Sequence, residues 1–253
     1  MRNMDSGMTA KSRGARPWPA TDQGPWPPTG PSTIRDLEKL CQTYWPAVYA
    51  FLRLNSRQKP EDAKDLTQGF FAHLIHNDRW QRYAPEKGRF RNWLLKCLKY
   101  YLLNEIDRAR VRVKLPEAIS FTTEEGEKLI ESLLASGVTP DEAFDLQWAR
   151  TLLRTILDSL KKEYEEVGKV ERFEVLQPYI ADEAERGDYK KAATKLGITE
   201  GAARRAAFDL RERFEVVRNK EIRRFASAGE VNAEIRELAG IVSRPRRSAR
   251  AGR

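Results

Sequence analysis

Two segments of this chain have the residue types and spacing to bind nucleic acid. The first extends from Lys87 to Lys96 and reads KGRFRNWLLK, while the second extends from Asp188 to Phe214 and reads DYKKAATKLGITEGAARRAAFDLRERF. Aromatic rings stack on unpaired bases while cations hold phosphates, so the first segment suits opened DNA. The second has the form of a helix-turn-helix, which suits the major groove of duplex DNA.

The uneven distribution of charge supports a polyanionic partner more strongly than the formal net charge of +9 does. Residues 86–114 contain nine Lys or Arg and three Asp or Glu, whereas residues 115–145 contain one Lys and eight Asp or Glu. Such alternation predicts basic modules joined by an acidic connector.

The second segment predicts a turn of defined geometry between two helices. Tyr189 to Leu196 form the first helix, and Gly197 supplies the turn because a positive backbone φ favours a residue without Cβ. Thr199 is the expected N-cap of the second helix. We expect the contact that fixes the angle between the helices to involve Ala193, Leu196, Ile198 and Ala203.

The second helix of this pair carries the residues that would face DNA. Arg204 and Arg205 can reach phosphates or the acceptor edge of guanine, and the sequence does not decide between the two. A purely structural helix hairpin is the alternative, but it leaves the cap and the paired arginines unexplained. The residues expected toward the groove or its rim are Gly201, Ala202, Arg204, Arg205 and Phe208, with Arg211, Arg213 and Arg218 on the DNA backbone or in solvent.

The remaining hydrophobic pattern predicts an all-α protein. Apolar residues recur at helical spacing from about Ser32 onward, and Pro46 within this run predicts a kink or two abutting helices. Thr139-Pro140-Asp141-Glu142 is a strong helix start. Further helices are expected at about 60–75, 90–110, 124–135, 140–164, 170–181, 200–222 and 231–242.

These elements predict two small helical domains joined by a flexible acidic linker. Residues 33–114 form the first domain, residues 115–139 the linker, and residues 140–225 the second domain, which contains the helix-turn-helix. Residues 1–32 hold six Pro and four Gly and are expected to be disordered. Residues 226–253 are expected to form a last helix and a flexible tail rich in arginine.

Two helices of the predicted first domain have distinct faces. After Pro60, the polar residues Asp62, Asp65 and Gln68 recur at a spacing of three, opposite an apolar stripe. In the helix after Phe90, the residues expected to face inward are Trp93, Leu94, Cys97, Tyr101 and Ile106.

No residue set in the sequence indicates an enzyme or a metal site. His73 and His76 stand three residues apart without further ligands nearby, and no Walker loop, GxSxG or HExxH is present. Cys41 and Cys97 are isolated, so we expect reduced thiols in a cytoplasmic protein. No apolar run approaches the ~20 residues that span a bilayer. We therefore expect no catalytic residue, no cofactor, no small-molecule substrate and no membrane association.

Three segments resemble bacterial RNA polymerase sigma factors. KPEDAKDLTQGFFAHLI (59–75) looks like their polymerase-binding helix, GRFRNWLLKCLKYYLLNEIDRAR (88–110) like their promoter-melting helix, and ITEGAARRAAFDLRERF (198–214) like their −35-reading helix. The order and spacing resemble the extracytoplasmic-function class. LCQTYWPAVYAFLR (40–53) and PEKGRFRNWL (85–94) are similar to a planctomycete-like subgroup of it.

The resemblance implies roles for matching positions. The polymerase core would bind one face of the helix after Pro60, formed by Asp62, Asp65, Leu66, Gln68 and Phe71. The −10 element would meet residues of the melting helix, although Trp93 falls on its apolar stripe and is expected in the core. The candidate DNA contacts are Arg89, Arg91, Lys96, Tyr100, Asn104, Thr199, Arg204, Arg205, Phe208 and Arg211.

The resemblance implies RNA polymerase core and promoter DNA as partners, and an anti-sigma factor is a common further partner in the class. The first alternative is a regulator that binds duplex DNA without joining the polymerase. The others are a protein-interaction module with incidental basic charge, and a nucleic-acid enzyme. The sequence does not reveal the promoter sequence, the activating signal or the role of the two terminal extensions.

Overall fold

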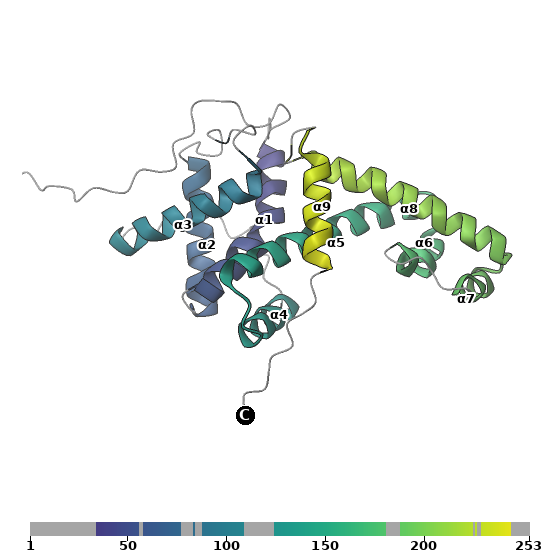
Figure 1. The fold of residues 1–253 in the computed structure, drawn as a ribbon, viewed down its shortest axis with the longest axis horizontal. Coiled ribbons are helices and arrows are strands. Elements are labelled where there is room, and N and C mark those ends of the chain that lie inside the picture. Colours follow the sequence, from purple (N-terminus) through teal and green to yellow (C-terminus); the bar gives the residue numbers. More distant parts are fainter. Residues whose placement is uncertain are drawn as a thin grey trace, which may run out of the picture.

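The computed structural model describes residues 34–55, 58–76, 83, 88–108, 124–180, 188–224, 226 and 229–243, and in these residues every regular element is helical. This confirms the predicted all-α class. The predicted disordered extension and the arginine-rich tail after Ser243 lie outside the described residues. The α-helices (Figure 1) are α1 (Ile34–Asn55), α2 (Pro60–His76), α3 (Phe90–Arg108), α4 (Glu124–Ala135), α5 (Pro140–Glu166), α6 (Val170–Leu176), α7 (Asp188–Leu196), α8 (Glu200–Ile222) and α9 (Val231–Val242), with a 3₁₀ turn at Gln177–Tyr179.

Helix α1 lies at the centre of its neighbours and is buried on nearly every side. Helices α2, α4 and α5 all pack against it. Pro46 lies within α1, so the predicted alternative of two abutting helices is wrong. Proline removes one backbone hydrogen bond, but burial of the flanking Trp45 and Ala47 supports the continuous helix.

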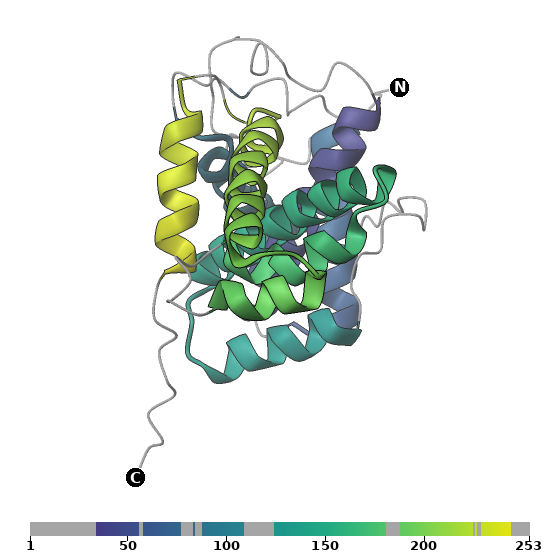
Figure 2. The ribbon, with the colours of Figure 1, turned by 90° about the vertical axis from the view of Figure 1, so that its right-hand side faces the viewer.

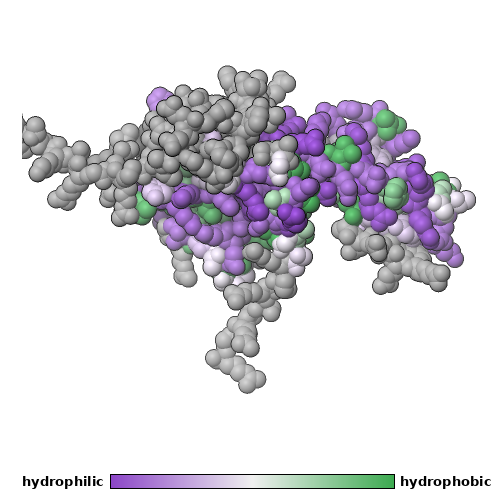
Figure 3. Space-filling model, turned by 45° about the horizontal axis from the view of Figure 1, so that its top comes forward, coloured by the Kyte–Doolittle hydropathy of each residue, from purple (hydrophilic) through white to green (hydrophobic). Residues whose placement is uncertain are grey.

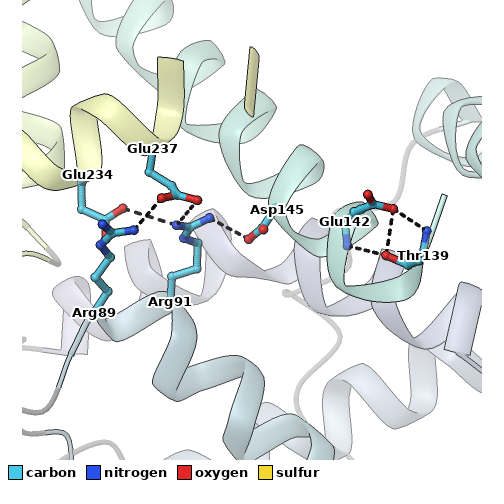
Figure 4. A network of polar contacts seen from close by, with 7 residues as sticks. All are labelled: Arg89, Arg91, Thr139, Glu142, Asp145, Glu234 and Glu237. Atoms are coloured by element: carbon cyan, nitrogen blue, oxygen red, sulfur yellow. Dashed lines mark hydrogen bonds and ion pairs between the residues drawn. The ribbon is translucent and has the colours of Figure 1, made fainter. Parts of the chain in front are cut away.

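Helix α5 begins where the sequence predicted, because its first turn is closed by a capping box. The Glu142 N–H donates to Thr139 Oγ1 at 3.3 Å, and the Thr139 N–H donates to Glu142 Oε2 at 2.9 Å (Figure 4). These two bonds satisfy donors that a helix start otherwise leaves unpaired, and Pro140 lacks such a donor.

The most extensive packing between two helices joins α5 to α1. Trp148 and Phe144 of α5 are fully buried, and the Phe144 ring stacks on Tyr44 of α1 with centroids 6.5 Å apart. Helix α4 adds the buried Ile130. Helices from both predicted domains, and α4 from the predicted linker, therefore share one hydrophobic core.

The C-terminal end of α5, together with α6, α7 and α8, forms an arm that extends to one side of the molecule (Figure 1). Helix α8 runs from α7, at one end of the molecule, back toward α9, and α9 crosses both α5 and the C-terminal end of α8 (Figures 1 and 2). The ends of α9 match the predicted residues 231–242. This crossing brings the C-terminal helix close to the start of α3.

Both cysteines lie in the core, and their reactivity should report on it. Burial raises the pKa of the Cys41 thiol to about 12, with a smaller contribution from Glu38. Since the thiolate is the reactive form, native Cys41 should react with a thiol reagent at pH 8 roughly a thousandfold more slowly than in urea. Time-resolved titration of a Cys97→Ala variant with a chromogenic disulfide measures this, and a fast-reacting thiol in the native variant would contradict it.

Candidate nucleic-acid interface

The two arginines of the first basic segment are engaged by carboxylates, with Arg91 buried and Arg89 partly exposed. Arg91 is only 2% exposed, and its Nη1 lies 2.6 Å from Asp145 Oδ1 of α5. Its Nη2 lies 3.9 Å from Glu234 Oε2 and 3.7 Å from Glu237 Oε1, both on α9. Figure 4 shows Arg91 pointing from α3 into the space between α5 and α9.

Arg89, just before α3, is held by the same two glutamates. Its Nη1 donates to Glu237 Oε2 at 2.7 Å, and its Nε lies 3.5 Å from Glu234 Oε1. The hydrogen bond to Glu237 is the main reason that the Arg89 pKa is raised. We call Arg89, Arg91, Asp145, Glu234 and Glu237 the arginine–carboxylate cluster (Figure 4).

Burial sets the electrostatics of this cluster. The Arg91 guanidinium carbon lies 4.3 Å from the ring centroid of Trp148, a cation–π contact on the floor of the cluster. Burial raises the pKa of Glu234, and the attraction of Arg91 and Arg89 opposes that shift without cancelling it. Ionised Glu234 therefore retains part of its desolvation cost in the closed cluster.

The other candidate DNA contacts of α3 have different surroundings. Lys96 is exposed and Tyr100 is partly exposed, whereas Asn104 is buried. Trp93 is also buried, as predicted, and its ring packs against Phe90 with centroids 5.4 Å apart. The structure therefore brings Arg89 and Arg91 together and leaves Lys96 as the exposed cation of the set.

The turn before α8 has the geometry that the sequence predicted. Gly197 has φ +63°, and Thr199 accepts a hydrogen bond from the Ala202 N–H at 3.2 Å. Ala193 and Ala203 are buried between α7 and α8, as expected.

The prediction that Ile198 takes part in the contact between these two helices is wrong, because its side chain is exposed. Its N–H donates back to Ala193 O at 3.1 Å, which closes the end of α7. Five alanines, Ala192, Ala193, Ala203, Ala206 and Ala207, are buried at this end of the arm. Their small side chains let the helices approach closely, so no large side chain is needed to fill the space between α7 and α8.

The first half of α8 presents cations and an aromatic ring to solvent. The side chains of Arg204 and Arg205 are 61% and 74% exposed, and their ion pairs with Glu200 and Asp209 lie within one turn of the same helix. The Arg205 guanidinium lies 5.3 Å from the centroid of Phe208, which is 46% exposed. Arg211 is partly buried and donates to Tyr189 Oη at 3.4 Å, so it braces α7 against α8.

No family model, no curated protein and no solved structure matches this chain. Within the described part of the chain, no group of three or more His, Cys, Asp or Glu could hold a metal ion. No helix in that same part is long and apolar enough to cross a membrane. The function is therefore inferred from the side chains themselves.

The candidate polymerase-binding residues on α2 divide between surface and core. Asp62 and Asp65 are exposed, and Leu66 and Gln68 are partly exposed. Phe71 is buried and stacks on Trp45 with centroids 5.6 Å apart, so it holds α2 on α1 in this structure. An incoming protein would meet the acidic pair and not Phe71.

The three carboxylates of the arginine–carboxylate cluster were not predicted from the sequence. Asp145 is 54 residues from Arg91, and Glu237 is 148 residues from Arg89. The one local signal is the spacing of Glu234 and Glu237, which places two acids on the same face of a short amphipathic helix.

Proposed function

We propose that this protein is a sigma factor of the extracytoplasmic-function class, which binds RNA polymerase core and directs initiation by reading −10 and −35 elements. The observation that carries the proposal is the exposed group Arg204, Arg205 and Phe208 at the start of α8, behind the tight turn at Gly197. A helix held this way is suited to enter the major groove.

The proposed −35 contact depends on how easily α8 can exchange its present partners. The ion pairs of Arg204 and Arg205 join residues four apart on an exposed helix, where such a pair contributes about 0.3–0.5 kcal/mol. Phosphates or guanine can replace partners held so weakly. Gly201 and Ala202 are exposed and small, which lets the helix backbone approach the DNA closely.

The proposed polymerase contact is supported by the rigid placement of an acidic pair. Asp62 and Asp65 lie three residues apart on α2, and both are exposed. The opposite side of α2 is fixed by Phe70, which packs edge-on against Tyr101 of α3, and by Phe71. A partner of opposite charge would therefore meet carboxylates whose backbone is already ordered.

The proposed −10 contact combines Lys96 with Arg89 and Arg91 at the start of α3. Opened DNA offers phosphates to cations and bases to aromatic rings. Such a protein would act in the cytoplasm, need no cofactor and form no bond itself, because the polymerase carries out the chemistry.

Charge reversal on α2 tests this proposal. Asp62→Arg, Asp65→Arg should reduce capture of purified bacterial RNA polymerase core by at least about tenfold, because two favourable charge contacts become repulsive. Glu165→Arg, Glu166→Arg is the matched control, since it reverses two exposed acids at the end of α5 and should leave capture unchanged. Failure of the wild type to bind a cognate core would refute the sigma-factor proposal.

A regulator of duplex DNA is the second candidate, and one observation favours it. Arg89 and Arg91 are engaged by carboxylates while Arg204 and Arg205 are exposed, an arrangement ready for duplex DNA without strand opening. Tight binding of promoter duplex together with no capture of core would support this candidate over the first.

A further inference from the structure

Resting on the proposed −10 contact, we propose that α9 inhibits this chain's own binding of opened DNA. Glu234 and Glu237 would occupy Arg89 and Arg91 as stand-ins for DNA phosphates, and single-stranded DNA would displace them. The proposal concerns regulation of the α3 site by a segment of the same chain, far from it in sequence.

The geometry of the contacts supports competition for the same atoms. Arginine binds carboxylates and phosphates with the same planar set of N–H donors. Glu237 already accepts from Arg89 at 2.7 Å and lies 3.7 Å from Arg91. A phosphate bound to the same N–H groups of these arginines would need the positions that the Glu234 and Glu237 carboxylates now fill (Figure 4).

The position of α9 makes it the element that would have to move. Glu234 and Glu237 lie one turn apart on its α3-facing side, while the buried Val231, Leu238 and Ile241 seat it on its neighbours, among them α5 and α8. These apolar contacts hold a helix of only 12 residues, whereas α3 is fixed in the core by Leu94 and its neighbours. Detachment of α9 therefore exposes the arginines at a smaller cost than movement of α3 would.

The carboxylates from α5 and α9 do not bind the two arginines equally well, and this difference favours exchange of the α9 glutamates for DNA phosphates. Asp145, which belongs to α5, lies 2.6 Å from Arg91 and would remain in place if α9 moved. Glu234 is 4% exposed, and its pKa is raised, mainly by burial, despite the opposing attraction of the two arginines. Release of α9 returns this carboxylate to water and leaves Arg89 and Arg91 beside the positive N-terminal end of α3.

Charge-neutral variants measure this competition without polymerase. Binding of a fluorescent single-stranded oligothymidylate, followed by anisotropy, should become about tenfold tighter in Glu234→Gln, Glu237→Gln, because two arginines become available to phosphates. Glu166→Gln, Glu171→Gln is the matched control, since it makes the same net-charge change at exposed positions on α5 and α6. Its affinity should change less than about twofold. Adding Arg89→Gln to the first variant should remove most of the gain.

Two results would overturn the proposal. One is equal tightening in both double variants, which would assign the effect to net charge alone. The other is unchanged or undetectable oligonucleotide binding in a Glu234→Gln, Glu237→Gln protein whose circular dichroism and unfolding transition match the wild type. Because no polymerase is present, these results are independent of the core-capture experiment.

Hydrogen exchange on the unaltered protein gives a second test that does not depend on how the variants fold. Backbone amides of Ile235 to Ile241 should lose protection when saturating oligothymidylate binds, since displaced α9 leaves its apolar seat. Full protection of these amides in the bound state would show that DNA binds without moving α9, and would also overturn the proposal.

Discussion

Trp148→Ala should lower the free energy of unfolding by about 3–5 kcal/mol. Its side chain is fully buried on α5, within the core that α5 shares with α1 and beneath the Arg91 guanidinium. Removing it creates a cavity and removes the cation–π contact together. Urea denaturation followed by circular dichroism measures the change.

The same variant also tests whether α1 and α5 unfold together. In a shared core, a cavity on α5 should speed the reaction of Cys41, which is buried on α1, with a thiol reagent in dilute urea. Phe208→Ala is the control, because its ring is 46% exposed on α8 and its loss should change stability by less than about 0.5 kcal/mol. Unchanged Cys41 reactivity in a destabilised Trp148→Ala protein would indicate that the two helices unfold independently.

Helix ends were predictable because local chemistry determines them. The capping box of Thr139 and Glu142, the positive φ of Gly197 and the cap at Thr199 each involve residues within four positions of one another. Such interactions leave a pattern in any short window of sequence, and α9 was placed by its apolar spacing in the same way.

Partners between helices were not predictable by this route. The apolar stripe of α5 predicts that Phe144 and Trp148 are buried, but it does not indicate which surface covers them. The sequence predicted this helix in a second domain, and in the structure its stripe packs on α1. Whether the chain also behaves as two domains when it binds a partner stays a prediction.

The candidate site shows the same division between local and distant information. Arg204 and Arg205 were expected on the surface and are exposed, because their neighbours on α8 decide which way they face. Arg91 lies in an equally basic stretch, yet it is buried by carboxylates from α5 and α9. The net charge of a short segment indicates a basic surface, but it does not predict which carboxylates from distant parts of the chain reach its arginines.

Arg91→Ala should lower the free energy of unfolding by about 3–5 kcal/mol, because it leaves acidic groups in a partly buried site without their cation. Glu234 is almost fully buried and would keep Arg89 as its one cationic partner among the described residues, while Asp145 would lose the contact at 2.6 Å. The neutral combination Arg91→Met, Asp145→Asn, Glu234→Gln should recover much of that loss, since no charge is then left unpaired. Urea denaturation of the two variants beside the wild type measures the difference.

Arg205→Ala provides the comparison that separates a structural arginine from a surface one. Its pair with Asp209 is exposed and within one helical turn, so its removal should change stability by less than about 0.5 kcal/mol. If Arg91→Ala were equally mild, the carboxylates around Arg91 would not be holding α3, α5 and α9 together. A large loss for Arg91 and a small one for Arg205 would mean that the buried carboxylate contacts of Arg91 hold these helices together, whereas the exposed ion pair of Arg205 contributes little to the fold.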